Sequence, residues 1–140
     1  MKLVSFEVEC PIGPHCRLGC LEGSTVVDIT AAYRELLANG GDGNVDAKVQ
    51  SATSAAMIDF LRLGESALET AESAVNAVRE GSVSPSANRR LEYDVSSVTL
   101  LSPLPRPNSI KDCTVYEQHF LNSRDVLRDT GFRVRVRVNF

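Results

Sequence analysis

The chain has 140 residues, of which 43% are hydrophobic and 24% charged, and its formal net charge is −3. This length and balance are typical of one globular domain, or of a small domain followed by the beginning of another, and they exclude a disordered chain. The slightly acidic charge gives no electrostatic reason to expect nucleic acid or an anionic membrane as a partner. No export signal follows Met1, and no apolar run approaches the about 20 residues that span a bilayer, so we expect a cytoplasmic protein.

The N-terminal region has the pattern of short β-strands. Leu3–Glu9 alternates apolar and polar residues, which is the period of a half-buried strand. Pro11, Gly13 and Pro14 are predicted to end it. Two further short strands, Arg17–Leu21 and Thr25–Asp28, flank a Glu-Gly turn and predict a β-hairpin.

Helical patterns follow. Thr30 is predicted to cap a helix over Ala31–Ala38, which a pair of glycines ends. Shorter helical patterns begin near Asp46 and Ser54. The strongest helix is predicted for Glu65–Arg79, because its apolar residues recur at the spacing of one helical face.

Beyond the helices, the sequence returns to strands and then to proline. Leu91–Asp94 and Ser97–Leu101 are predicted strands that pair with the opening hairpin. Ser102–Asn108 contains three prolines, which exclude a helix and predict an extended strap. We therefore expect an α+β fold, a small mixed β-sheet packed against two or three helices. The domain boundary is placed at the strap, with residues 1–100 before it and 101–140 after it.

The last residues form a separate pattern. Val115–Arg128 is predicted to be a helix, and Phe132–Phe140 alternates apolar residues with three arginines and an asparagine. The three arginines form one face that is suited to phosphate or carboxylate. A solvated outer face that discourages edge pairing is the favoured interpretation.

Four soft metal ligands occur close together near the N-terminus, namely Cys10, His15, Cys16 and Cys20. Their spacing differs from that of a zinc knuckle, which pairs cysteines two to four residues apart. Free thiols that pack as small hydrophobic groups are therefore favoured over a zinc site.

Two segments resemble the fumarylacetoacetate hydrolase family. Leu101–His119, which reads LSPLPRPNSIKDCTVYEQH, is similar to the proline-rich strap, aspartate and Gln-His pair that open the catalytic β-rich domain of that family. Arg17–Ile29, which reads RLGCLEGSTVVDI, resembles the hairpin of its small N-terminal domain. The resemblance implies an N-terminal domain followed by a truncated start of the catalytic domain.

The family resemblance implies a chemistry. Its members hydrolyse a carbon–carbon bond in acylpyruvate, β-diketo or related 2-oxo acids with a divalent ion, usually Mg, Mn or Ca. By this resemblance Asp112 corresponds to a metal-ligand aspartate and His119 to the general base that activates water. A hard cation prefers carboxylate oxygens, and a histidine accepts a proton at neutral pH. The plainer alternatives are a helix cap for Asp112 and a packed or surface side chain for His119.

The set of catalytic residues is incomplete in this chain. After His119 the only carboxylates are Asp125 and Asp129, and the Glu-x-Glu ligand pair of the family is missing. One aspartate is too few for a cation that takes about six oxygen ligands. The sequence thus predicts an N-terminal fragment of such a hydrolase that is inactive alone. The alternative is a non-catalytic module that docks on a full-length relative or forms a homo-oligomer.

Overall fold

The computed structural model describes residues 1–86, 89–104, 107, 109 and 121–122. The chain divides into two compact units, Met1–Pro107 and Asn108–Phe140, and the fold below is that of the first unit. Asp112, His119 and the Phe132–Phe140 alternation lie outside the described residues, as does nearly all of the predicted Val115–Arg128 helix.

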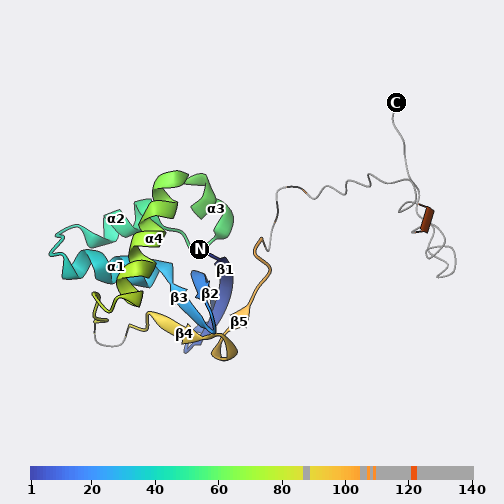
Figure 1. Cartoon of the computed structure of the whole chain (residues 1–140), viewed down its shortest axis with the longest axis horizontal. Coiled ribbons are helices and arrows are strands. Elements are labelled where there is room, and N and C mark those ends of the chain that lie inside the picture. The colour runs from blue at the N-terminus through green and yellow to red at the C-terminus, as the bar shows by residue number, and fades with distance from the viewer. Residues whose placement is uncertain (87–88, 105–106, 108, 110–120, 123–140) are drawn as a thin grey trace. The chain divides into compact units, whose positions relative to one another are not determined.

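A five-stranded antiparallel sheet organises the first unit (Figure 1). The spatial order of the strands is β4-β3-β2-β1-β5. Hairpins join β1 to β2 and β2 to β3, and antiparallel neighbours need only such short connections. The sheet is therefore antiparallel throughout, not mixed as expected from the sequence. Its strands are β1 (Leu3–Cys10), β2 (Gly13–Glu22), β3 (Thr25–Asp28), β4 (Glu92–Asp94) and β5 (Thr99–Leu100).

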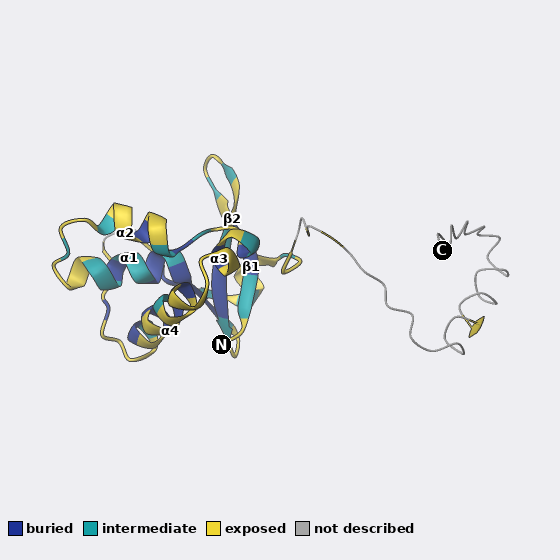
Figure 2. Ribbon diagram, turned by 90° about the horizontal axis from the view of Figure 1, so that it is seen from above, coloured by how far each residue is buried: buried dark blue, intermediate teal, exposed yellow. Residues whose placement is uncertain are grey.

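The first strand ends at Cys10, directly before Pro11, as predicted, but the second strand begins at Gly13, earlier than expected, and includes Pro14. The two strands pair from Leu3↔Cys20 to Cys10↔Gly13, which leaves Pro11 and Ile12 as the turn. Pro14 is tolerated because β3 pairs with β2 only from residue 19 to residue 22, so no ladder bond from its missing N–H is required there. The end of this hairpin is largely exposed (Figure 2).

Four helices gather on one side of the sheet (Figure 1): α1 (Ile29–Asn39), α2 (Val45–Ala52), α3 (Met57–Arg62) and α4 (Glu65–Arg79). The cap of α1 is Asp28, whose side chain accepts a hydrogen bond from the Ala31 amide, so the prediction of Thr30 as cap was wrong. None of the described helices is long and apolar enough to cross a bilayer. The α+β class is confirmed, with more helices than the two or three expected.

Each face of the sheet has its own apolar cluster. On the helix side, Leu18, Cys20 and Val27 pack with residues of α1, α3 and α4. On the other side, Phe6, Val8 and Val26 are buried under Tyr93 and the 3-10 turn η1 (Val95–Ser97). Consecutive residues of a strand point to opposite faces, so β3 supplies Val27 to the cluster on the helix side and Val26 to the cluster on the other side.

Candidate functional site

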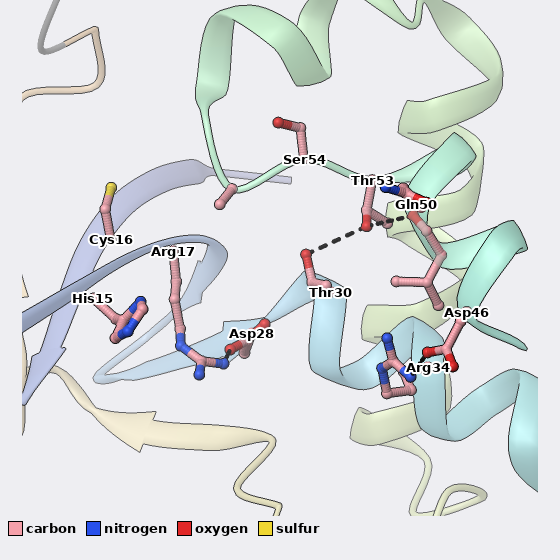
Figure 3. Close-up of a pocket in the computed structure, with 12 residues that line it drawn as sticks. His15, Cys16, Arg17, Asp28, Thr30, Arg34, Asp46, Gln50, Thr53 and Ser54 are labelled. Carbon is pink, nitrogen blue, oxygen red and sulfur yellow. Dashed lines mark hydrogen bonds and ion pairs between the residues drawn. The ribbon is translucent and has the colours of Figure 1, made fainter. Parts of the chain in front are cut away.

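Two adjoining hollows lie beside the N-terminal turn of α1. We call the first the hairpin–helix cleft (Figure 3) and the second the arginine cleft. Their volumes are about 550 Å³ and 530 Å³, and they share Arg17, Thr30 and Arg34. The hairpin–helix cleft is lined by His15, Cys16, Arg17, Asp28, Thr30, Arg34, Asp46, Val49, Gln50, Thr53, Ser54 and Ala55.

An ion pair joins β2 to β3 at the two hollows, where Arg17 lines both and Asp28 lines the hairpin–helix cleft. The Arg17 Nη1 lies 2.6 Å from the Asp28 Oδ2, and Asp28 is fully buried. Because Asp28 pairs with Gly19 across the two strands, Arg17 is its diagonal neighbour on the same face of the sheet. Burial alone lowers the pKa of Arg17, but the hydrogen bond and charge of Asp28 outweigh it and raise that pKa. The Arg17 Nε is buried and has no hydrogen-bond partner among the residues that the structure describes.

The same Asp28 also fixes the start of α1. Its Oδ1 accepts the Ala31 N–H at 2.9 Å, which satisfies one of the unpaired amides of the first helical turn. Its own backbone N–H donates to the Leu91 carbonyl oxygen at 2.9 Å. One residue thus joins β3, α1 and the segment that leads into β4.

The far wall of the hairpin–helix cleft joins α1 to α2. The Thr30 hydroxyl donates to the Thr53 hydroxyl oxygen at 3.4 Å, and the Thr53 hydroxyl donates to the Val49 carbonyl at 2.8 Å. Arg34 forms an ion pair with Asp46. These contacts position α1 against α2, and both threonine hydroxyls donate their hydrogen bonds within the wall of the cleft.

The cysteine and histidine of this cleft do not form a nucleophile–base pair. Cys16 and His15 are consecutive residues of β2, and consecutive strand residues point to opposite faces. Figure 3 shows the sulfur and the imidazole ring directed away from each other. A thiolate activated by a neighbouring imidazole needs the two groups within hydrogen-bond reach.

The arginine cleft adjoins the hairpin–helix cleft at the three residues that line both. Its lining includes four arginines from three parts of the chain, together with the first turn of α1 and Tyr93. Arg89 Nη1 lies 2.5 Å from the Glu35 Oε1, and the Arg90 guanidinium lies 5.0 Å from the centre of the Tyr93 ring. At this distance the guanidinium is attracted by the ring quadrupole.

Glu35 is a buried carboxylate, only 2% exposed, that contacts Arg89 of this cleft. Ser86 donates to it twice, through its hydroxyl at 2.7 Å and its backbone amide at 3.2 Å, and Arg89 adds an ion pair. Burial raises the pKa of Glu35, but the hydrogen bonds from Ser86 and Arg89 outweigh burial and lower that pKa overall. Glu35 is therefore held ionised as the anchor of the segment between α4 and β4.

The four soft side chains that were considered as zinc ligands are spread along the β1–β2 hairpin. Cys20 pairs with Leu3 at one end of it and is fully buried, whereas Cys10 pairs with Gly13 beside the turn. Cys16 is exposed. Among the described residues no three His, Cys, Asp or Glu side chains are grouped as a metal site would require.

Comparison of the chain with models of protein families, with curated proteins and with solved structures finds no match. The similarity to fumarylacetoacetate hydrolases therefore rests on the sequence motifs, and the activity, metal and substrate that it implies are proposals.

Glu35 and the Arg89-Arg90 pair were not singled out from the sequence as parts of a site. A signal for Glu35 was present, because it follows Ala31 by four residues and so falls on the apolar face of the predicted helix. A carboxylate at such a position requires a partner. The sequence does not say which of its cations supplies that partner, because Arg89 is distant along the chain.

Proposed function

We propose that the chain is the N-terminal portion of a cytoplasmic fumarylacetoacetate hydrolase-like protein. In this proposal residues 1–107 are a non-catalytic domain, and the segment after it contributes the first motif of a metal-dependent carbon–carbon hydrolase. Asp112 is one ligand of a Mg, Mn or Ca ion, and His119 is the base that activates water. The chain is inactive alone, because the remaining carboxylate ligands are not part of it.

The observation that carries this proposal is the order of features along the chain. The hairpin expected from Arg17–Ile29 is present as β2–β3, and helices follow it directly. The division between compact units at Pro107–Asn108 falls within the predicted strap, just before Asp112 and His119. This order is what the resemblance implies for a small domain that precedes a catalytic motif.

The buried acids of the first unit support a structural role for it. Asp28 caps α1 and pairs with Arg17, and Glu35 holds Ser86 and Arg89. Carboxylates that form these contacts have their charges compensated inside the fold. A catalytic carboxylate instead must lie within reach of the proton that it transfers.

A chimeric enzyme tests the proposal. Residues 1–125 are joined to the downstream catalytic segment of a fumarylacetoacetate hydrolase, and turnover of an acylpyruvate is measured with Mg²⁺ or Mn²⁺. We expect turnover from the chimera and none from the 140-residue chain alone. Asp112→Asn and His119→Ala are expected to abolish the activity, and the control Asp59→Asn, which alters an exposed acid of α3, is expected to keep it.

Two results would contradict the proposal. Chimera activity that survives both Asp112→Asn and His119→Ala would remove the assigned roles. Turnover by the 140-residue chain alone that is lost in His119→Ala would show that it is active without a second polypeptide.

The alternative function is an interaction or assembly module that docks on a full-length relative or on a second copy. The alternation of Phe132–Phe140 favours it, because an apolar strand face is suited to pairing with another chain. Size-exclusion chromatography with light scattering tests this alternative. A stable monomer that does not bind a full-length fumarylacetoacetate hydrolase would count against it.

A further inference from the structure

We propose that the arginine cleft binds a small anion that carries several phosphate or carboxylate oxygens. Four guanidinium groups converge on one hollow of about 530 Å³: Arg17 from β2, Arg34 from α1, and Arg89 and Arg90 from the segment before β4. This volume is within the range of about 300–1,000 Å³ that is typical of small-molecule sites. The proposal is independent of the hydrolase resemblance.

Buried carboxylates hold two of these arginines in place. Asp28 and Glu35 are 0% and 2% exposed, and each contacts its arginine through one terminal nitrogen, Nη1. A guanidinium has several N–H donors in a planar fork, so one contact leaves donors for a second acceptor. Because the carboxylates are buried, they orient the guanidinium groups without facing the hollow. Such fixed side chains lose less conformational entropy when a ligand binds.

Arg90 provides the positive charge that is least compensated. Among the residues that the structure describes, Arg90 forms no ion pair. Its Nε donates to the Glu92 carbonyl oxygen at 2.9 Å, and the guanidinium lies over the Tyr93 ring. Its terminal nitrogens remain available to an oxyanion. Arginine is suited to this, because its fork matches the oxygens of phosphate and carboxylate in bidentate geometry.

The backbone at the start of α1 adds to the positive electrostatic potential of the arginine cleft. Thr30 and Ala31, in the first turn of α1, line the cleft, and the positive end of a helix dipole, part of which the Asp28 carboxylate already compensates by capping α1, favours an anion. The only acidic side chain among the lining residues described is Glu9. Exposed arginine–carboxylate pairs are often purely structural. Here the arginines lie together in one hollow, which a purely structural role does not require.

Isothermal titration of the 140-residue chain at low salt tests the proposal with two probes, pyrophosphate and citrate. We expect saturable binding that weakens as salt is added, and the tighter probe identifies phosphate or carboxylate as the preferred group. Arg90→Gln is expected to weaken binding by roughly tenfold, the effect of losing one charge-assisted hydrogen bond. Arg62→Gln makes the same change in charge on α3, outside the cleft, and is expected to leave binding unchanged.

A second pair of variants has an effect of opposite sign. Glu9→Gln removes the acidic lining residue and is expected to tighten binding by about threefold, whereas Glu7→Gln, two residues along the same face of β1 and outside the lining of the cleft, is expected to have a smaller effect. No saturable binding of either probe up to about 10 mM would overturn the proposal. So would equal losses in Arg90→Gln and Arg62→Gln, or equal effects of the two glutamate variants, because these indicate attraction by overall charge alone.

Discussion

At the scale of single residues, Asp28 determines how α1 meets the sheet. Its carboxylate is fully buried and receives a guanidinium from β2 and an amide from α1. Removing one partner of a buried ion pair costs about 3–5 kcal/mol, because the other charge is left without compensation. The side chain of Arg17 is 37% exposed, so solvent screens part of this cost.

The substitution Asp28→Asn removes the negative charge of this side chain but keeps an oxygen that can cap α1. Asparagine is a good helix cap, so the hydrogen bond to the Ala31 amide is retained while the ion pair with Arg17 is lost. We expect the free energy of unfolding to fall by about 2–3 kcal/mol in urea denaturation. The matched control Asp59→Asn breaks an exposed pair with Arg62 and is expected to cost less than about 0.5 kcal/mol. Equal losses in the two variants would contradict a special role for Asp28.

The helix start was predictable from the sequence to within one turn, but the cap itself was not. Asp28 and Thr30 are both good capping residues, and local preference does not separate them. The tertiary structure separates them, because the Thr30 hydroxyl is directed to Thr53 of the next helix segment while Asp28 is buried under Arg17. The cap is thus determined by contacts that are distant in sequence.

At the scale of elements, the close approach of β1, β2 and β3 depends on Gly19. A Cβ atom built at Gly19 would lie 2.7 Å from the Val26 Cγ1 and 2.9 Å from both the Phe6 Cε1 and the Val27 carbonyl oxygen. These atoms belong to strands on both sides of β2 and include backbone, so the strands themselves would have to move apart. The absence of a side chain lets the curved face of the sheet close around Phe6.

Gly19→Ala is therefore expected to destabilise the protein by about 2–3 kcal/mol, through overpacking between the strands. The control is Gly43→Ala, because a Cβ there would meet nothing within 4 Å and Gly43 is exposed in the loop before α2. Thermal unfolding followed by circular dichroism compares the two variants. A loss in Gly19→Ala no larger than that in Gly43→Ala would show that the strands move apart at no cost.

The described residues between α4 and β4 form no helix or strand, and Glu35 of α1 anchors them. Ser86 and Arg89 both contact this buried carboxylate, and Val83 and Leu91 pack into an apolar cluster with Ala31 and Ala77. The anchor depends on the charge of Glu35, because its pKa is lowered in the folded protein. A group with a lowered folded-state pKa adds stability above its ordinary pKa, and that stability is lost as the pH falls through the folded value.

Glu35→Gln is expected to make the protein less stable at pH 7 than the unchanged chain. This difference in the free energy of unfolding is expected to persist down to the ordinary carboxyl pKa of 4.5 and to shrink at lower pH, where Glu35 becomes protonated. Urea denaturation at about pH 7, 5 and 3.5 measures it. Other acids titrate in this range as well, and the difference between the two proteins removes their contribution. A difference that stays constant with pH would contradict the ionised anchor.

At the scale of the whole molecule, the first unit contains the apolar clusters of the described fold. Among the described residues, Leu101 and Pro103 follow β5 along the edge of β1, where the Leu101 amide donates to the Ser5 carbonyl and the Ser5 hydroxyl donates to the Pro103 carbonyl. β5 pairs with β1 just before these contacts. A chain that ends at residue 107 therefore keeps every described contact of this sheet edge.

Truncation tests whether the first unit is stable by itself. A chain of residues 1–107 is expected to unfold cooperatively with a melting temperature close to that of the 140-residue chain. A chain of residues 1–98 is expected to melt at a lower temperature, because it loses β5 and leaves the edge of β1 unpaired. Differential scanning calorimetry compares the three chains. Failure of residues 1–107 to unfold cooperatively would contradict an independent domain.

The sequence by itself determined the α+β class, the β2–β3 hairpin and the position of α4. These features follow from patterns within short stretches of chain, namely alternation, turn glycines and helical spacing. The sequence also placed the Asp112 and His119 motif, which remains a prediction because both residues lie outside the described structure.

Only the tertiary structure decided what lies beside the N-terminal turn of α1. The pairing of Glu35 with Arg89 spans 54 residues, and the Arg17–Asp28 pair depends on the register between two strands. The physical reason is that a buried carboxylate requires a cation, but any of several arginines satisfies that requirement until the packing of the sheet and α1 brings one within reach. The same packing brings Arg17, Arg34, Arg89 and Arg90 together in the arginine cleft.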